Sequence, residues 1–242
     1  MEYIEFEALF CKSMQKNSLL IPKKQQIEQL WHFTEHLLKV NQVTNLTAIR
    51  NIPDTISKHL VDSLLCSEYL PQGARVLDVG CGPGFPSVPL AIARPDLKIV
   101  ALDSTSKKIA FVQESAELLQ LSNLSALSGR AEDATITQKL GKFDAVVSRA
   151  VAKMSILAEL CIPYLKIGGK FVALKAAKAE EELAEAKNAI RTLGGASAIQ
   201  HNKELVLLDD TNEQRSLLEI AKIKETPRGY PRSYSQISKK PL

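Results

Sequence analysis

The spacing of hydrophobic residues changes near residue 74, and this change separates a helical front from an alternating middle. Residues 24–40 carry large apolar side chains at roughly helical spacing, at Ile27, Leu30, Trp31, Phe33, Leu37 and Leu38. Pro53 fits the first position of a second helix that runs to about Leu70. We therefore expect an N-terminal helical extension over residues 1–70.

Short β-rich runs alternate with helical stretches from Ala74 onward. The runs that fit strands read RVLDVG, LKIVALD, LSALSG, FDAVVS and GKFVALK, and the stretches between them are long enough for crossover helices. Alternation of this kind predicts a mainly parallel sheet with helices on both faces, which is a Rossmann-like α/β fold. We expect this domain to span residues 71–225.

The predicted sheet ends in a hairpin. Gly194 and Gly195 follow a polar helix at about 178–193, and two more strand-like runs lie near 196–208 and 217–225. Their short separation is typical of a hairpin. We therefore expect an antiparallel strand at the edge of the sheet.

Composition places the chain among ordinary globular proteins, with 242 residues of which 45% are hydrophobic and 24% charged. The N-terminus, MEYIEFEALF, has acids where a secretory signal carries positive charge, and no apolar run approaches the ~18 residues of a membrane span. No CxxC pair occurs among the four cysteines, which are Cys11, Cys66, Cys81 and Cys161. We expect a monomeric cytoplasmic protein with reduced thiols, no metal site and no membrane partner.

Positive charge gathers at the C-terminal end. Residues 222–242 hold six Lys and Arg residues against one acid, which gives this segment a charge of +5. The whole chain has a net charge of +4, so the first 221 residues carry −1. Tyr230 and Tyr234 lie between these charges. Such a segment can bind phosphates while its rings stack on bases, and a solvated terminus is the alternative. We treat residues 226–242 as a basic tail.

A glycine-rich turn follows the first predicted strand and reads Gly80-Cys-Gly-Pro-Gly-Phe-Pro86. A strand, a turn of this kind and a helix form a nucleotide-sized crevice at the carboxyl edge of a parallel sheet. A dinucleotide site needs G-x-G-x-x-G, but Phe85 occupies the third glycine position. The observed G-x-G-x-G, preceded by Asp78, suits a ligand whose cationic amino-acid end meets a carboxylate.

Two further strand ends extend this candidate site. Asp103 ends the second strand nineteen residues after Gly84, where a carboxylate can accept hydrogen bonds from both ribose hydroxyls of an adenosine. The third strand ends at residues 128–133, where backbone groups at Ala131 and Glu132 would lie beside an adenine. Three strand ends fit one ligand, so the sequence favours S-adenosylmethionine over NAD, and a nicotinamide-dependent oxidoreductase is the alternative enzyme class.

The fourth strand bears on the methyl acceptor. It ends in Ser148-Arg-Ala-Val151, without the Asp/Asn/Ser-Pro-Pro-aromatic loop typical of exocyclic amino methylation and without the Pro-Cys nucleophile of cytosine-C5 enzymes. Cys161, which precedes Ile162-Pro163, fits the core better. What remains is alkylation of an atom that is already nucleophilic, such as guanine N7. Catalysis would then rest on alignment, which can supply about 7–11 kcal/mol of a barrier.

The chain resembles the RsmG family, once called glucose-inhibited division protein B, which methylates guanine N7 in the 530 loop of 16S ribosomal RNA. The resemblance covers nearly the whole chain, through residues 41–49, 59–63, 78–86, 103–108, 129–132, 148–151 and the closing Lys-Lys-Pro-Leu. It implies a class I S-adenosylmethionine-dependent methyltransferase fold. It also implies 16S ribosomal RNA or the assembling small ribosomal subunit as partner.

The resemblance further implies which residues line the cofactor pocket. They are Gly80, Phe85, Asp103, Ser104, Thr105, Ala131, Glu132 and Arg149. Gly82, in the glycine-rich turn, is a further candidate. The chain departs from the family at Cys81, at Ser87 and Ala176, where glycine is usual, and in Ser-Tyr-Ser-Gln-Ile-Ser of the tail, where glycine and proline are usual.

Two residues are candidates for placing the base. Asn45, by spacing alone a helix cap or loop residue, becomes through the resemblance a wall of the base pocket. Arg149 follows the fourth strand and can donate a fork of hydrogen bonds to guanine O6, to phosphate or to the cofactor carboxylate, with a surface salt bridge as the alternative.

The remaining candidates concern RNA. His59 can donate a hydrogen bond or contact phosphate, although a lone histidine on a helix is more often structural, and N7 methylation requires no general base. Lys175 at the end of the fifth strand and Arg228 and Arg232 in the tail are the candidates for phosphate contact. A methyltransferase acting on another RNA or a small molecule, and an RNA-binding assembly factor without turnover, remain alternative functions.

Overall fold

The computed structural model describes residues 1–149, 152–176 and 179–242, and within these ranges seven strands form one sheet in the order β3-β2-β1-β4-β5-β7-β6. The strands are β1 Arg75–Val79, β2 Lys98–Asp103, β3 Leu124–Ser128, β4 Phe143–Arg149, β5 Leu165–Lys175, β6 Ile199–Val206 and β7 Asn212–Ala221. Strands β1 to β5 pair in parallel, which confirms the predicted α/β fold.

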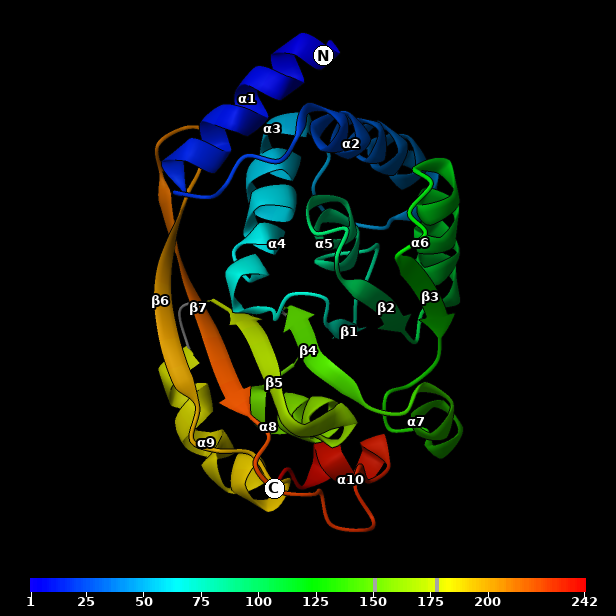
Figure 1. Cartoon of the computed structure of the whole chain (residues 1–242), viewed down its shortest axis with the longest axis vertical. Coiled ribbons are helices and arrows are strands. Elements are labelled where there is room, and N and C mark those ends of the chain that lie inside the picture. The colour runs from blue at the N-terminus through cyan, green and yellow to red at the C-terminus, as the bar shows by residue number, and fades with distance from the viewer. Residues whose placement is uncertain (150–151, 177–178) are drawn as a thin grey trace.

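Helices cover both faces of the sheet (Figure 1). One face carries α1 Tyr3–Lys16, α2 Lys24–Thr44, α3 Ile52–Asp54, the π-helical turn η1 Thr55–Val61, α4 Asp62–Leu64, the 3-10 turn η2 Ser67–Tyr69, α5 Ser87–Ala93 and α6 Ser106–Leu118. The other carries α7 Ala134–Leu140, α8 Met154–Cys161, the 3-10 turn η3 Ile162–Tyr164, α9 Ala179–Thr192 and α10 Tyr234–Lys239. The protein therefore has three layers.

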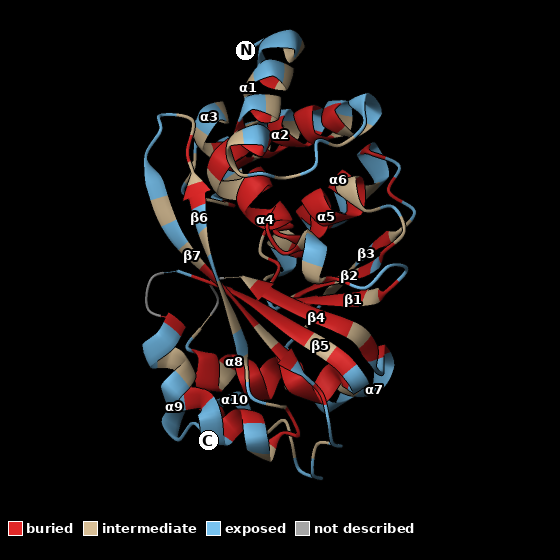
Figure 2. Ribbon diagram, turned by 60° about the vertical axis from the view of Figure 1, so that its left-hand side comes forward, coloured by how far each residue is buried: buried red, intermediate tan, exposed pale blue. Residues whose placement is uncertain are grey.

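The central strands are buried on both faces, as Figure 2 shows. In β1, Val76 joins the core beneath the N-terminal helices, whereas its neighbour Leu77 joins the core beneath α8 and α9. The same alternation sends Val147 and Val146 of β4 to opposite cores. Because successive strand residues point to opposite faces, a continuous apolar run is what a doubly covered strand requires.

The predicted hairpin is present, but its strands lie at 199–206 and 212–221. The second strand begins earlier than the run at 217–225 because polar residues of β7, Asn212 to Ser216, pair with the outermost strand β6 and need no burial. Strand β7 runs antiparallel to β5 and lies between β5 and β6, so the antiparallel strand is one place in from the edge.

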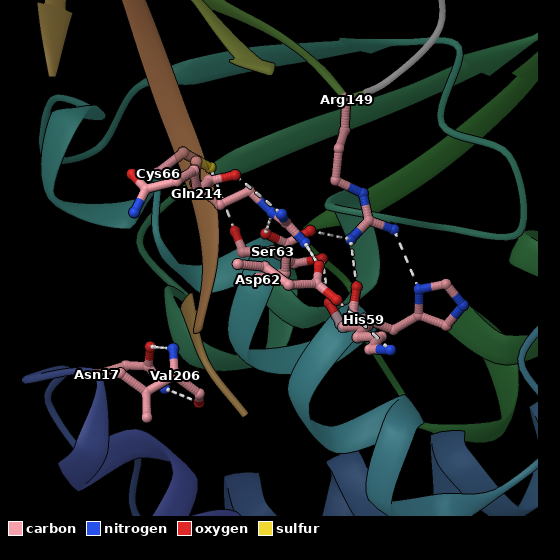
Figure 3. Close-up of polar contacts among 11 residues, drawn as sticks. Asn17, His59, Asp62, Ser63, Cys66, Arg149, Val206 and Gln214 are labelled. Carbon is pink, nitrogen blue, oxygen red and sulfur yellow. Dashed lines mark hydrogen bonds and ion pairs between the residues drawn. The ribbon is translucent and has the colours of Figure 1, made fainter. Parts of the chain in front are cut away.

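The N-terminal helices pack into the same core as the sheet. Phe6 of α1 lies 5.1 Å from Trp31 of α2 between ring centroids, and both belong to the core beneath this face. At the end of α1, Asn17 exchanges two hydrogen bonds with the backbone of Val206 in β6, at 2.8 and 2.9 Å (Figure 3). These contacts join the first residues of the chain to the far edge of the sheet.

Three local predictions need correction or lie outside the description. The region from Pro53 to Leu70 is not one helix, because a π-helical turn interrupts it at Thr55–Val61. Ala150 and Val151, which belong to the block at the end of β4, and residue 178, the expected start of α9, lie outside the described residues.

Two further features concern the described ranges alone. Within them, no helix combines the length and the apolar composition that crossing a membrane requires. The four cysteines are free thiols, as predicted, and Cys161 is fully buried in the core.

Candidate active site

Two cavities meet at the carboxyl edge of the sheet, around the end of β1. The strand cavity measures about 240 Å³ and is lined by Val79, Gly80, Leu102, Asp103, Ser104, Gly129, Arg130, Ala131, Glu132, Leu160 and Tyr234. The helix cavity measures about 310 Å³ and is lined by Leu46, Thr47, His59, Gly80, Cys81, Gly82, Pro83, Phe85, Asp103, Lys108 and Arg149. Gly80 and Asp103 line both. The chain reverses its direction of winding at β1, which is where parallel sheets bind ligands.

The glycine-rich turn is held against the end of β2. The amide of Gly80 donates to the carbonyl of Leu102 at 2.8 Å, and the amide of Gly82 donates to Oδ2 of Asp103 at 2.9 Å. Gly84 has φ +101°, and a Cβ there would come within 2.5 Å of the Val88 side chain. Only glycine therefore allows this turn to pass so close to α5.

Asp103 lies between the two cavities with both carboxylate oxygens oriented by backbone groups. Oδ1 accepts from the amide of Thr105 at 2.8 Å and Oδ2 from the amide of Gly82. Each carboxylate oxygen can accept a further hydrogen bond. The side chain is thus fixed and can still receive hydroxyl groups from a ligand in the strand cavity.

The far wall of the strand cavity is the backbone that follows β3, from Gly129 to Glu132. The hydroxyl of Tyr164 donates to the carbonyl of Ala131 at 2.7 Å and holds this backbone in place. Two further lining residues, Leu160 of α8 and Tyr234 of α10, were not predicted from the sequence. The sequence marked Tyr234 only as a ring of the basic tail that could stack on bases of RNA, and no local motif marks Leu160.

In the helix cavity the rings of His59 and Phe85 stack, with centroids 4.3 Å apart and planes 20° from parallel. Nη2 of Arg149 lies 3.3 Å from Nδ1 of His59 (Figure 3). Oγ1 of Thr47 lies 2.7 Å from Nε2 of the same ring. Because a guanidinium only donates, Nδ1 accepts and Nε2 carries the proton. Burial, followed by the positive charge of Arg149, lowers the pKa of His59 to about 3, so its imidazole is neutral.

Arg149 is held by one short stretch of the chain, residues 58–62. Its Nη1 donates to Oδ2 of Asp62 at 3.0 Å and to the carbonyl of Lys58 at 3.1 Å (Figure 3). The other oxygen of Asp62 accepts from Nε of Arg215 in β7 at 2.8 Å. The carbonyl of Lys58 belongs to the π-helical turn, so the irregular helix supplies a backbone acceptor that fixes the guanidinium.

Asn45 lies beside the helix cavity. It ends α2 in the left-handed conformation with φ 50°, and its exposed side chain accepts a hydrogen bond from Arg50 at 3.3 Å. The residues that line the cavity here are the next two, Leu46 and Thr47. Both lie in residues 41–49, the block of family resemblance that made Asn45 a candidate, so this block could have pointed to them as well.

The predicted phosphate contacts have different environments. Lys175 is 8% exposed and pairs with Glu182 at 2.6 Å, and Arg232 pairs with the buried Glu159 at 2.6 Å. Both charges are therefore already matched by carboxylates. Arg228, by contrast, lies exposed in the tail.

Asp78 does not line either cavity, contrary to the expectation that it meets the cationic end of a ligand. It is fully buried, and Oδ2 accepts from both the amide and the hydroxyl of Ser87. Burial raises the pKa of Asp78 to about 7. Ser87, a departure from the family, thus supplies a hydroxyl partner to a buried carboxyl group.

The arrangement suits alignment of two reactants better than proton transfer. The described part of the chain holds no group of three His, Cys, Asp or Glu side chains placed to bind a metal ion. The histidine at the site is neutral and already has partners on both ring nitrogens. The joined cavities can hold a nucleoside beside Asp103 and a second planar group beside Arg149.

Comparisons with known proteins identify the family. The family model GidB, described as rRNA small subunit methyltransferase G, matches residues 26–206. Ribosomal RNA small subunit methyltransferase G of Lachnoclostridium phytofermentans is 45% identical over 90% of both chains, and that of Brevibacillus brevis is 43% identical over 90% of this chain and 91% of the relative.

Solved structures agree on the fold. An O-methyltransferase from Bacillus cereus in complex with SAH superposes with a TM-score of 0.56 at 19% identity, covering 90% of this chain and all of the other. The likeness at this identity concerns the architecture alone, whereas the family match covers most of the sequence. The chain therefore belongs to the GidB family of rRNA small subunit methyltransferases G.

Proposed function

We propose that the protein transfers the methyl group of S-adenosylmethionine to N7 of a guanine in the 530 loop of 16S ribosomal RNA. The observation that carries the proposal is the pair of joined cavities, one beside Asp103 and one beside His59 and Arg149. The relatives' name, ribosomal RNA small subunit methyltransferase G, supports ribosomal RNA as the substrate.

The residues of the strand cavity fit the nucleoside part of the cofactor. Asp103 would accept hydrogen bonds from the ribose hydroxyls, and the backbone from Gly129 to Glu132 would flank the adenine. Ser104 lines this cavity, and Thr105 orients Asp103 through its amide. The cofactor supplies a methyl group that is activated by its bond to a sulfonium.

The helix cavity fits an acceptor that needs no deprotonation. His59, with a pKa of about 3, is neutral and is bonded to Thr47 and Arg149. It therefore forms part of the cavity wall and brings no charge to it. Guanine N7 is nucleophilic without losing a proton, so its methylation needs no general base in this cavity. Arg149 would place the base by donating to its O6, and Asn45 at the rim would assist.

The proposal separates the RNA-contact candidates by the environments described above. Arg228 is exposed and is the tail residue that we propose contacts phosphate. Arg232 and Lys175 would first have to leave Glu159 and Glu182. His59 would contact RNA only through a base that enters the helix cavity.

The decisive experiment compares ribosomal RNA from cells with and without this gene by mass spectrometry. We expect one 7-methylguanosine of 16S ribosomal RNA to disappear and to return with the wild-type gene. A gene carrying Arg149→Ala should restore far less. Unchanged 7-methylguanosine would contradict the substrate and favour another RNA, a small molecule or a non-catalytic assembly role. Titration with S-adenosylmethionine and NADH tests the cofactor separately.

A further inference from the structure

The end of the basic tail is docked on the sheet's second face. Ile237 of α10 is fully buried in the core beneath α8 and α9. Glu159 of α8, also fully buried, accepts three hydrogen bonds from Arg232, one from its amide at 2.9 Å and two from its guanidinium at 2.8 and 2.6 Å. Since a buried carboxylate is costly without its partner, this pair fixes where the segment lies.

The anchor places an aromatic ring at the strand cavity. Tyr234, two residues after Arg232, lines the cavity together with Gly129 to Glu132. The guanidinium of Arg130, another lining residue, lies 5.9 Å from the centroid of the Tyr234 ring. Leu160 also lines the cavity and follows Glu159 directly, so helix α8 carries both the anchor of the tail and part of the cavity wall.

The ring of Tyr234 is suited to a planar ligand. It is 43% exposed, which is high for a large ring, and it is the one Phe, Tyr or Trp side chain in the described lining of the strand cavity. Asp103 occupies the part of this cavity nearest the glycine-rich turn, as its hydrogen bond to Gly82 shows. A nucleoside with its ribose at Asp103 would have its base toward Gly129–Glu132 and Tyr234.

We propose that Tyr234 is a cofactor-binding residue that packs against the adenine of S-adenosylmethionine. Aromatic faces stack on nucleic-acid bases irrespective of hydrogen bonding, which gives the ring a role that its hydroxyl does not share. The inference rests on the cofactor of the proposed function.

The test measures the affinity of the full-length protein for S-adenosylhomocysteine and for adenosine by calorimetry. Tyr234→Ala should weaken both by about 10-fold, the effect of losing one base–aromatic stack. Tyr234→Phe should bind within about twofold of wild type, because stacking needs the ring alone. Ser238→Ala, exposed on the same helix, is the matched control and should leave both affinities unchanged.

The outcomes separate this inference from the proposed function. Failure of the wild type to bind S-adenosylhomocysteine would remove the cofactor itself. A wild type that binds, with Tyr234→Ala equal to it, would overturn the role of Tyr234 and leave the proposed function standing. Equal losses in Tyr234→Ala and Ser238→Ala would likewise overturn it, because they would report disturbance of α10 as a whole.

The anchor gives an independent test. Glu159→Gln combined with Arg232→Gln removes the ion pair without leaving a buried charge unpaired. We expect the double variant to bind adenosine about as weakly as Tyr234→Ala, since undocking the segment also removes the ring. If the double variant does not fold, the pair Tyr234→Ala and Tyr234→Phe decides alone.

Discussion

The two cavities of the active site differ in what holds their walls in place. The strand cavity is formed largely by the ends of β1, β2 and β3, whose register is set by backbone pairing such as Asp103 with Ser128. The helix cavity depends on side chains from distant segments, with Asp62 joining Arg149 of β4 to Arg215 of β7. A continuous sheet therefore positions the first cavity, and a nearly buried charge network positions the second.

Because of this difference, single substitutions should have different consequences in the two cavities. In the strand cavity the strand ends are held by backbone pairing, so a side-chain change removes one ligand contact and leaves the wall standing. In the helix cavity one carboxylate, Asp62, is shared by two guanidiniums. Loss of that carboxylate disturbs three elements at once. The predictions below test this contrast in decreasing order of effect.

The largest effect is expected from Asp62→Ala. The Asp62 side chain is 9% exposed, and removing it leaves Arg149 and Arg215 without their shared partner. Breaking a buried pair in this way costs about 3–5 kcal/mol of unfolding free energy, which urea denaturation measures. Asp54→Ala is the control, because its exposed pair with Lys58 should contribute under about 1 kcal/mol. Equal losses in the two variants would refute the special position of Asp62.

Arg149→Ala should spare stability more and reduce turnover strongly. Asp62 keeps its bond to Arg215, so no carboxylate is left unpaired. We expect single-turnover methyl transfer to fall by about 100-fold through misplacement of the base, with RNA affinity changing far less. Asn45→Ala should show the same pattern with a smaller loss, since its side chain is exposed and the residues that line the cavity are the next two, Leu46 and Thr47. Parallel losses of rate and RNA affinity would show that these residues bind RNA without placing the base.

Asp103→Ala tests the strand cavity. We expect the affinity for S-adenosylhomocysteine to fall by about 1.5–3 kcal/mol, the usual contribution of hydrogen bonds to a charged group. The fold should persist, because backbone pairing holds the strand ends. Asp133→Ala provides the control, since that exposed carboxylate caps α7 and does not line the cavity. Calorimetry that finds no difference between the variants would contradict the proposed role of Asp103.

The sequence predicted the strand cavity well because its signals are local. Apart from Leu160 and Tyr234, the residues that line this cavity end or follow a β-rich run, and parallel strands bring their carboxyl ends to one edge. Gly80, Asp103 and the Gly129–Glu132 backbone could therefore be assigned before the fold was known. Arg149 was placed at the site by the same reasoning.

The side-chain pairs that hold the two cavities in place could not be predicted, because their partners lie far apart in the chain. Arg149 and Asp62 are separated by 87 residues, and Arg232 and Glu159 by 73. Lys222, counted among the charges of residues 222–242, is 1% exposed and donates to the carbonyl of Leu193. Its burial lowers its pKa to about 8. The division of the chain at residues 70 and 226 stays a prediction.

The smallest expected effect on the rate concerns His59, and it separates a structural wall from a general base. Burial and Arg149 lower the pKa of His59 to about 3, so the imidazole is neutral throughout the range from pH 6 to 8. The rate of single-turnover methyl transfer should therefore show no dependence on pH from His59 in that range. His59→Gln should leave the shape of the pH profile unchanged. A rise of the wild-type rate near pH 6.5 that disappears in His59→Gln would establish His59 as a general base and overturn the mechanism.

The lowered pKa of His59 should also make the free energy of unfolding depend on pH. The unfolded state takes up a proton near the ordinary value of 6.5, whereas the folded state does so near 3. The stabilisation is thus fully present above pH 6.5 and is lost as the pH falls toward 3, with a slope that approaches about 1.4 kcal/mol per pH unit for one proton. Urea denaturation between pH 7 and pH 4.5 should show a steeper loss for wild type than for His59→Gln. Identical slopes would mean that His59 is protonated in the folded protein and that the bonds to Thr47 and Arg149 do not persist in solution.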